Sequence, residues 1–428
     1  MNQTSSSRYF PNAGYQSQTL LACCGEGRVK RDSTMQGLHA QGGEPAAKRQ
    51  HKAEAIDIPY DVLEQVLLCL PVKSLMRFKS VCKLWHDAIS SAHFERCQLQ
   101  LSRACQPSML ILPLRMMPDD LRMDKIRFFA YPGYGTVAEL MHEKLWSAGV
   151  DGFMQPIHCD GLVVVSAAHS SQIFVCNPAT KELVILPAGS PDNSIGIQKI
   201  GFGVDLSTGK YKVVRCFWRF CNEDMSDYSI GCEIFTLGSR AWKQVADPPY
   251  LIQNMMPLCL PGAIYWSAAI TLTTQVMLRF DLHKEEFTTF PSPPCMELTD
   301  RCTSLTNLAG NLWYTRYTCG QTVQLWMTKD DGVLLPKWLL HCTIVLPWPT
   351  WSMIPFSSYE GGIYLCLDLS HIYRYDTKRG ALEQVVNLNQ EMAYLHPYGT
   401  LNPYIPGGSD WLYCAVEYSE TMVSIRGH

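Results

Sequence analysis

Four short phrases of one pattern constrain the fold of this chain more than any other feature. Each begins at a glycine turn and continues as an apolar, aromatic-rich run: DGLVVVS at 160–166, PGAIYWS at 261–267, AGNLWYT at 309–315 and GGIYLCL at 361–367. The last three recur about every 50 residues, a period typical of repeat architectures. Helical spacing of apolar residues ends before the first phrase, so the repeated unit is predicted to be made of strands.

A second phrase alternates with the first and reads as strand, polar turn, strand. It occurs as FVCNPATKELVILP at 174–187, EIFTLGSRAWKQV at 233–245, RFDLHKEEFTTFP at 279–291 and YRYDTKRGALEQV at 373–385. Together the two phrases supply the strands of four-stranded blades around a channel, so residues 151–428 are predicted to form a β-propeller. The blade number stays open.

Residues 55–97 have a different sequence pattern, because their apolar residues recur at helical spacing and prolines interrupt the run. Three short helices are predicted, the first with Pro59 in its first turn and Pro71 stopping it, the third with Ser80 as N-cap. One apolar stripe is expected on the first helix: Val62, Leu63, Val66, Leu67 and Leu70. A trio this small carries more large apolar side chains than it can bury, so a partner surface is expected.

The helical segment resembles an F-box. The resemblance rests on IP at 58–59, LP at 70–71, VKSL at 72–75, RFKSVCKLW at 77–85 and AI at 88–89, with Ile58 where the family usually has Leu. It implies docking onto a Skp-type adaptor and, through it, cullin and RING subunits. The implied adaptor-binding residues are Pro59, Leu63, Leu67, Pro71, Leu75, Val81 and Trp85. The alternative for several of them is packing inside the trio itself.

The β-rich part resembles the plant F-box-associated domain, a kelch-like domain, over roughly residues 105–400. GFGVDLSTGKYKVVRCF at 201–217 and CNPATKELVILP at 176–187 carry this resemblance, and the paired glycine of kelch repeats is intact at 361–362. The expected fold class is therefore an α+β multidomain chain, a small three-helix F-box followed by an all-β kelch-like β-propeller. Residues 98–150 are expected to be a connecting segment that leads into the first strands.

Composition excludes several other classes. Residues 1–54 are rich in Ser, Gln, Gly and Ala and are predicted to be a disordered tail. The basic run KRQHK at 48–52 is interpreted as a solvated charge run, with part of a nuclear localisation signal as the alternative. A net charge of −3 does not suit a nucleic-acid clamp, and no apolar run approaches membrane-spanning length. The 18 scattered cysteines indicate reduced thiols, so a nuclear or cytoplasmic location, or both, is expected.

Motifs for catalysis are missing from the sequence. GFG at 201–203 lacks the third glycine of a dinucleotide site, and GxxxxGK[ST], CxxC, HExxH and GxSxG do not occur. The cluster His158, Cys159 and Asp160 is read as a turn before a strand. No catalytic residue, cofactor or metal is therefore expected, and the protein is predicted not to be an enzyme.

These observations predict the substrate-recognition subunit of an SCF-type (Skp–cullin–F-box) ubiquitin ligase, whose propeller binds a target protein for ubiquitination and degradation. Loops 217–229 and 346–352 are the expected contacts, with Trp218, Arg219, Trp348 and Trp351 as candidates. Aromatic residues at strand spacing more often pack between blades. The competing functions are a carbohydrate-binding or enzymatic propeller and an F-box scaffold that acts outside ubiquitination.

Overall fold

Four helices open the described part of the chain. They are α1 (Tyr60–Leu68), α2 (Val72–Phe78), α3 (Lys83–Ile89) and α4 (Ala92–Ala104). The expected number was three, and the fourth runs into the segment from residue 98 that was expected to be a connection. The Ser91 side chain caps α4 by accepting a hydrogen bond from the backbone amide of Phe94 at 3.1 Å. This cap was the sequence signal for the missed helix.

The proline and serine punctuation differs from its predicted roles. Pro59 and Pro71 are the N-caps of α1 and α2, so Pro71 starts a helix, and α1 has already ended at Leu68. The N-cap of α3 is Cys82 and not Ser80, whose hydroxyl donates to the Arg77 carbonyl at 2.7 Å. Ser80 is thus engaged with the end of α2 rather than with the start of α3.

The computed structural model describes residues 59–115, 123–150, 155–167, 172–193, 199–222, 227–253, 256–270, 274–294, 304–319, 321–328, 337–397, 399–402 and 411–426. The predicted tail at 1–54 and the basic run at 48–52 lie outside them. The helices and all the strands belong to one compact unit, Ile58–His428.

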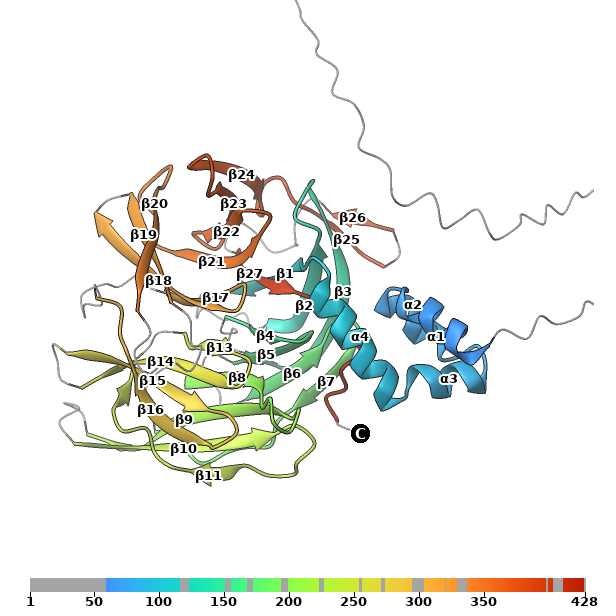
Figure 1. Ribbon diagram of the computed structural model, residues 1–428, viewed down its shortest axis with the longest axis horizontal. Coiled ribbons are helices and arrows are strands. Elements are labelled where there is room, and N and C mark those ends of the chain that lie inside the picture. Colours follow the sequence, from blue (N-terminus) through green and yellow to red (C-terminus); the bar gives the residue numbers. More distant parts are fainter. Residues whose placement is uncertain are drawn as a thin grey trace, which may run out of the picture. The chain divides into compact units, whose positions relative to one another are not determined.

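The strands of the described residues form six sheets. Figure 1 labels these strands, β12 excepted. Blade 1 is β4 (Ile157–Cys159), β5 (Leu162–Ser166), β6 (Ile173–Asn177) and β7 (Glu182–Ile185). Blade 2 is β8 (Lys199–Val204), β9 (Tyr211–Cys221), β10 (Tyr228–Thr236) and β11 (Lys243–Val245). Blade 3 is β12 (Leu251–Ile252), β13 (Leu258–Leu260), β14 (Ala263–Ala269), β15 (Gln275–Asp281) and β16 (Glu286–Phe290).

The remaining sheets are blades 4 and 5 and a closing blade. Blade 4 is β17 (Ser304–Leu308), β18 (Asn311–Cys319), β19 (Thr322–Thr328) and β20 (Leu339–Val345). Blade 5 is β21 (Met353–Tyr359), β22 (Gly362–Leu367), β23 (His371–Asp376) and β24 (Ala381–Asn387). The closing blade is β1 (Ser108–Arg115), β2 (Met123–Tyr131), β3 (Val137–Val150), β25 (Ala393–Leu395), β26 (Leu401–Asn402) and β27 (Trp411–Tyr418).

The blades form a closed ring, which makes the fold a six-bladed β-propeller. One strand of each blade contacts one strand of the next in the cyclic order β4, β8, β13, β17, β21, β27 and back to β4. The ring is closed by pairing β27 with β1 in antiparallel register from Ser108↔Tyr418 to Arg115↔Trp411. Because β1 to β3 belong to the closing blade, the propeller begins at residue 108 rather than at the expected 151.

The repeated phrases are hairpins. Each glycine phrase begins at a two-residue turn between neighbouring strands of a blade, and three of these turns have positive φ at both positions: Asp160–Gly161 (φ 52° and 81°), Ala309–Gly310 (φ 51° and 76°) and Glu360–Gly361 (φ 51° and 71°). Such turns need positive φ at both positions and match the twist of the strands they join, which explains the glycine. The strand-turn-strand phrases are the outer hairpins β6–β7, β10–β11, β15–β16 and β23–β24.

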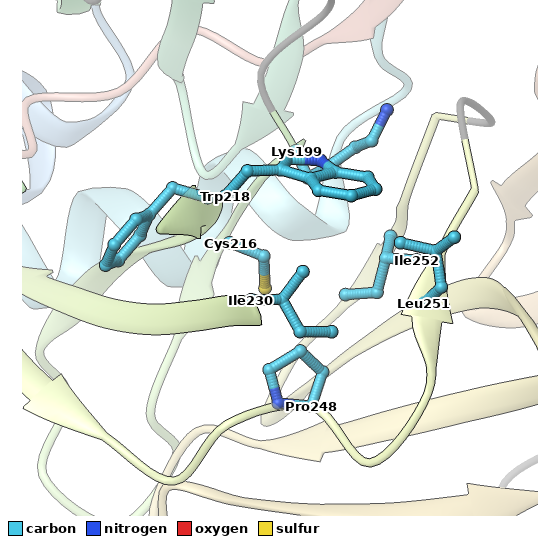
Figure 2. Close-up of a pocket in the computed structure, with 8 residues that line it drawn as sticks. Lys199, Cys216, Trp218, Ile230, Pro248, Leu251 and Ile252 are labelled. Atoms are coloured by element: carbon cyan, nitrogen blue, oxygen red, sulfur yellow. The ribbon is translucent and has the colours of Figure 1, made fainter. Parts of the chain in front are cut away.

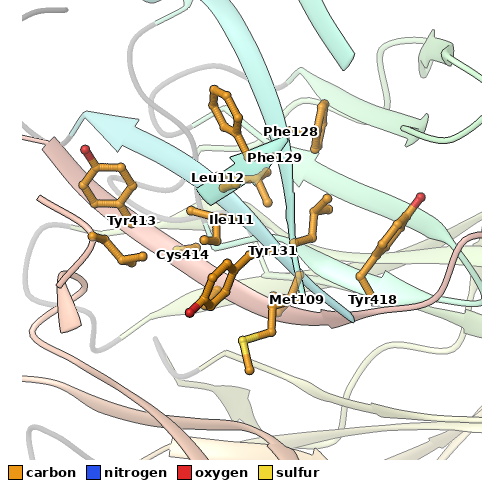
Figure 3. Close-up of a cluster of buried hydrophobic side chains, with 14 of the residues drawn as sticks. Met109, Ile111, Leu112, Phe128, Phe129, Tyr131, Tyr413, Cys414 and Tyr418 are labelled. Atoms are coloured by element: carbon orange, nitrogen blue, oxygen red, sulfur yellow. The ribbon is translucent and has the colours of Figure 1, made fainter. Parts of the chain in front are cut away.

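Apolar side chains fill the space between neighbouring blades. The cluster of the closing blade combines Phe129 and Tyr131 of β2 with Tyr413 and Tyr418 of β27, all fully buried (Figure 3). Trp266, Trp313 and Trp338 are buried between blades in the same way. Chain segments from both ends of the described sequence thus share one core, which holds the ring closed.

Candidate functional site

The F-box helices carry a small core of their own. It consists of Leu63, Leu67, Val72, Leu75, Ile89 and Phe94, together with Met422 from the other end of the described chain. Leu63, Leu67 and Leu75 are only 7%, 1% and 0% exposed. The side chains of these three predicted adaptor-binding residues therefore pack inside the helical unit and are not presented to solvent in this structure.

A second set of apolar side chains, on these helices and in the α2–α3 connection, faces solvent. Val62, Val66, Val81 and Leu84 are 52%, 55%, 59% and 56% exposed, and Tyr60 is 46% exposed. Of the predicted adaptor-binding residues, Pro59, Pro71 and Val81 are exposed, and Trp85 is half-buried with its ring edge-on to Phe78 at 5.0 Å.

The stripe expected on the first helix is therefore divided between two faces. Leu63 and Leu67 point to the core, whereas Val62 and Val66, four residues apart, share an adjoining exposed face. The sequence did not single out Tyr60, Val62, Val66 or Leu84 as contacts. The available signal was the width of the stripe, because a buried face on a helix this short does not need five large apolar residues.

The F-box is seated on one end of blade 1 and the closing blade. Arg103 of α4 donates two hydrogen bonds to the Asp160 carboxylate, at 2.8 and 2.6 Å, and Lys73 of α2 pairs with Glu139 of β3 at 2.6 Å. Ala179, in the β6–β7 turn, packs against the helical core. This end of blade 1 therefore carries the tight turns between its first and second and its third and fourth strands.

The predicted target-binding residues lie at the opposite end of their blades. In an antiparallel blade the connection from the second to the third strand, and the connection to the next blade, leave from the end opposite the tight turns. Trp218 and Arg219 are near the end of β9, the second strand of blade 2. Trp348 and Trp351 lie in the connection from β20 to β21. Loop 217–229 is only partly within the described residues.

Trp218 and Arg219 differ in what surrounds them. Arg219 forms a two-point ion pair with Asp247, both contacts at 2.8 Å. Its guanidinium lies 5.6 Å from the centre of the Phe217 ring, and that of Arg215 lies 5.1 Å from the same ring. Trp218 contacts the Tyr228 ring and lines a pocket of only about 10 Å³ (Figure 2). That volume holds about one water molecule, so the pocket is not a substrate cavity.

Lys199 also lines this pocket. Burial lowers the pKa of its amine to about 8, although the carboxylate of Asp192 acts in the opposite direction.

Trp348 and Trp351 have separate roles in one loop. The Trp348 indole donates to the Asp368 carboxylate at 2.7 Å and packs against His371 and Tyr373. The Trp351 backbone amide donates to the same carboxylate at 2.9 Å, whereas its side chain is 54% exposed. Trp348 therefore fixes the loop, and Trp351 presents its ring to solvent.

Comparison with known families decides the identity of the chain. A family model described as an F-box domain matches residues 56–97, and one described as an F-box associated beta propeller domain matches residues 136–333. A putative F-box protein of Arabidopsis thaliana is 29% identical over 322 residues, covering 70% of this chain and 81% of the relative. The chain is a plant F-box protein with an F-box-associated propeller domain. Both predicted resemblances are confirmed.

Other relatives of this F-box protein cover less of their own length. An F-box/LRR-repeat protein of Arabidopsis thaliana is 27% identical over 277 residues, which is 62% of this chain and 62% of the relative. The F-box protein therefore spans less than two thirds of that relative. Among solved structures, apo AztD from Citrobacter koseri aligns at 9% identity with a TM-score of 0.39 over 74% of this chain and 100% of that one, a likeness too low to support a conclusion.

The cluster at His158 is built as a turn in the F-box protein. The His158 Nε2 accepts a hydrogen bond from the Gly161 amide at 2.9 Å, and burial lowers the pKa of His158 to about 4. Asp160 is held by Arg103 and by the Tyr211 hydroxyl at 3.0 Å. Within the described residues, no group of three or more His, Cys, Asp or Glu could hold a metal ion. No helix in this part of the chain is long and apolar enough to span a membrane.

Proposed function

We propose that this F-box protein is the substrate-recognition subunit of an SCF-type ubiquitin ligase. The observation that carries the proposal is the solvent-facing set Val62, Val66, Val81 and Leu84, in a helical unit that already has a core. Apolar side chains exposed in this number on one small unit indicate a protein partner. A Skp-type adaptor is the partner that an F-box implies, and cullin and RING subunits would follow through it.

The propeller would hold the target at the end that carries the long connections, away from the F-box seat. Exposed Trp351 and the Arg219–Asp247 pair are the described groups that a target would meet there. The contribution of the F-box protein to ubiquitin transfer would be proximity, which raises the effective concentration of target lysines at the charged enzyme without a catalytic side chain of its own. The activity would take place in the nucleus, the cytoplasm or both.

Co-purification with a Skp-type adaptor tests the first half of the proposal. Val66→Asp combined with Leu84→Asp puts charges at two exposed apolar positions without touching the core, so adaptor affinity should fall at least tenfold while the melting temperature stays unchanged. The matched control is Leu145→Asp, which changes a 63% exposed leucine on β3 and should bind normally. Failure of the folded native chain to bind any Skp-type adaptor would overturn the proposal.

Target recognition is tested separately by proximity labelling with the propeller intact. Proteins labelled by the native chain should accumulate in cells when residues 56–97 are deleted, because the target would still be bound but no longer brought to the ligase. Unchanged levels of every labelled protein would favour an F-box scaffold that acts outside ubiquitination.

A further inference from the structure

The segment after β27 connects the F-box to blade 1. Residues 419–426, called the strap below, run between helix α4 and the β6–β7 hairpin. On the helix side, Met422 belongs to the core of the F-box helices. On the other side, Val423 and Ile425 belong to the cluster between blades 1 and 2 and are 2% and 3% exposed. The strap is thus part of two cores at once.

Two buried amide side chains hold the strap from opposite sides. Gln98 of α4 donates from Nε2 to the Glu420 carbonyl at 3.3 Å and accepts from the Met422 amide at 3.0 Å. Asn177 of β6 donates from Nδ2 to the carbonyls of Thr421 and Val423, at 3.0 and 2.9 Å. Alternate residues of an extended chain face opposite ways, so the helix binds 420 and 422 and the blade binds 421 and 423.

The turn at Asn177 does not itself require an amide. Five turns of the described chain begin with an Asn or Asp side chain that accepts hydrogen bonds from the backbone amides two and three residues on. These residues are Asn177, Asp205, Asp281, Asp376 and Asn387. Asn and Asp both supply the acceptor oxygen that the turn needs. The two residues differ in the remaining polar atom of the side chain, which is an amide nitrogen in Asn and a second carboxylate oxygen in Asp, so that atom must set the choice.

The remaining polar atom of the side chain has one kind of neighbour in the aspartates and another in the asparagines. The three aspartates each have a cation, with Asp205 at 3.2 Å from Lys212, Asp281 at 3.1 Å from Arg279 and Asp376 at 3.8 Å from Arg374. The two asparagines have acceptors instead. The Asn387 Nδ2 lies 3.0 Å from the His371 Nε2, and the Asn177 Nδ2 meets the two strap carbonyls. The amide at position 177 is therefore required by the strap and not by the turn.

We propose that the strap fixes the F-box in one position on blade 1, with Gln98 and Asn177 as its positioning residues. Both side chains are buried, at 7% and 0% exposed, so each bond to the strap is shielded from water and costly to leave unmade. The strap keeps the adaptor-binding face and the target-binding end at a constant separation. This last consequence rests on the proposed function.

The test uses two isosteric changes in the full chain and a matched control. Asn177→Asp keeps the turn acceptor but sets a carboxylate against the carbonyls of Thr421 and Val423, and Gln98→Glu does the same against Glu420. Asn387→Asp makes the identical swap in an equivalent turn away from the strap. Amide hydrogen exchange is followed in α4, in residues 419–426 and in β5.

Exchange in α4 and the strap should accelerate about tenfold or more in both test variants, with β5 unchanged, whereas Asn387→Asp should leave α4 and the strap as they are. Unchanged α4 exchange in both test variants would overturn the proposal, and so would an equal acceleration in the control. If Asn177→Asp does not fold, Gln98→Glu decides, because Gln98 lies on α4 outside the blades.

A positioning role also predicts a change in ubiquitin transfer that is separate from binding. A nanobody raised against the end with the long connections serves as the surrogate target, with the adaptor, cullin, RING subunit and charged conjugating enzyme supplied. Asn177→Asp should keep adaptor and nanobody affinities within about twofold but spread ubiquitin over more nanobody lysines. An unchanged lysine pattern would contradict the positioning role, whereas absent transfer with the native chain would contradict the proposed function instead.

Discussion

The F-box helices and the propeller blades differ in how completely they bury their large apolar side chains. The helices bury a small cluster and leave Val62, Val66, Val81 and Leu84 more than half exposed. The blades bury their large aromatic residues between neighbours, as with Trp266 at 0% and Trp313 at 4% exposed. A partner surface is therefore visible in the helical part as unburied apolar area, whereas in the propeller it has to be sought in the loops.

The two regions also differ in how a local defect should spread. Each blade packs against two others in a closed ring, so the free energy of unfolding of one blade depends on its neighbours. The F-box has a single seat, on blade 1, the closing blade and the strap. Damage between blades should therefore reach the whole propeller, and damage in the helical core should remain local.

Lys212→Met should have the largest effect, because Lys212 joins blades 2 and 3. Its ammonium is buried against Asp205 at 3.2 Å and Glu285 at 3.0 Å and donates to the Leu282 carbonyl. Removing one partner of a buried charge network costs about 3–5 kcal/mol. Chemical denaturation should show the loss as a single transition of the whole propeller. Loss of blade 2 and blade 3 signals alone would contradict the coupling.

Leu67→Ala should cost somewhat less and act only on the helices. Leu67 is 1% exposed in the F-box core, and truncation of such a leucine to alanine costs about 2–5 kcal/mol. Hydrogen exchange should accelerate in α1 to α3 and remain unchanged in β5 and β22. An equal acceleration in the blades would show that the two regions unfold together and would break the comparison.

The contact between blades 2 and 3 and the strap beside the F-box should depend on pH in opposite ways. Burial alone would raise the pKa of the Asp205 carboxyl, but hydrogen bonds from Thr208, Ser207 and Lys212 hold it well below its ordinary value. The folded state then binds fewer protons than the unfolded one, so this contribution is present above the ordinary carboxyl pKa and is lost as pH falls. The contact between blades 2 and 3 should weaken in acid.

Glu420 in the strap has the reverse dependence. Burial raises the pKa of its carboxyl, against a hydrogen bond from the Val72 amide, so its contribution is present in acid and is lost as pH rises through the folded-state pKa. Glu420→Gln should therefore stabilise the F-box seat at neutral pH, by about 1 kcal/mol or less, and have no such effect in acid. Hydrogen exchange of α4 at the two pH values measures this. A gain of equal size at both would contradict the assignment to ionisation.

The sequence contained most of the fold because the propeller repeats. The turns Asp160–Gly161 and Glu360–Gly361 can be recognised in the sequence by their glycine, because the turn requires positive φ there. Since the pattern recurs, each copy strengthens the prediction made from the others. The closing blade was missed because its strands come from the two ends of the described chain, and nothing in either segment shows that β1 pairs with β27. Long-range pairing leaves no local pattern.

The candidate site was predicted less completely, for a physical reason. Helical spacing shows that Leu63, Leu67 and Leu75 are apolar positions on a face, but it does not tell a face that packs inward from one that meets a partner. Only the burial of each side chain separates Leu67 from its neighbour Val66. The role of Asn177 was equally hidden, because its turn motif has the same form whether or not a strap passes beside it.

Val66→Ala should have the smallest effect on stability, and the contrast with Leu67 tests the comparison directly. Val66 is 55% exposed and adjoins Leu67 in α1, so both variants alter the same turn of the same helix. The free energy of unfolding should change by no more than about 0.5 kcal/mol, as for surface substitutions in general. Adaptor affinity should nevertheless fall, because this side chain can lose water only against a partner. A Val66→Ala variant that loses stability as Leu67→Ala does, with unchanged adaptor affinity per folded molecule, would place Val66 in the core and leave the helices without the partner surface that distinguishes them from the blades.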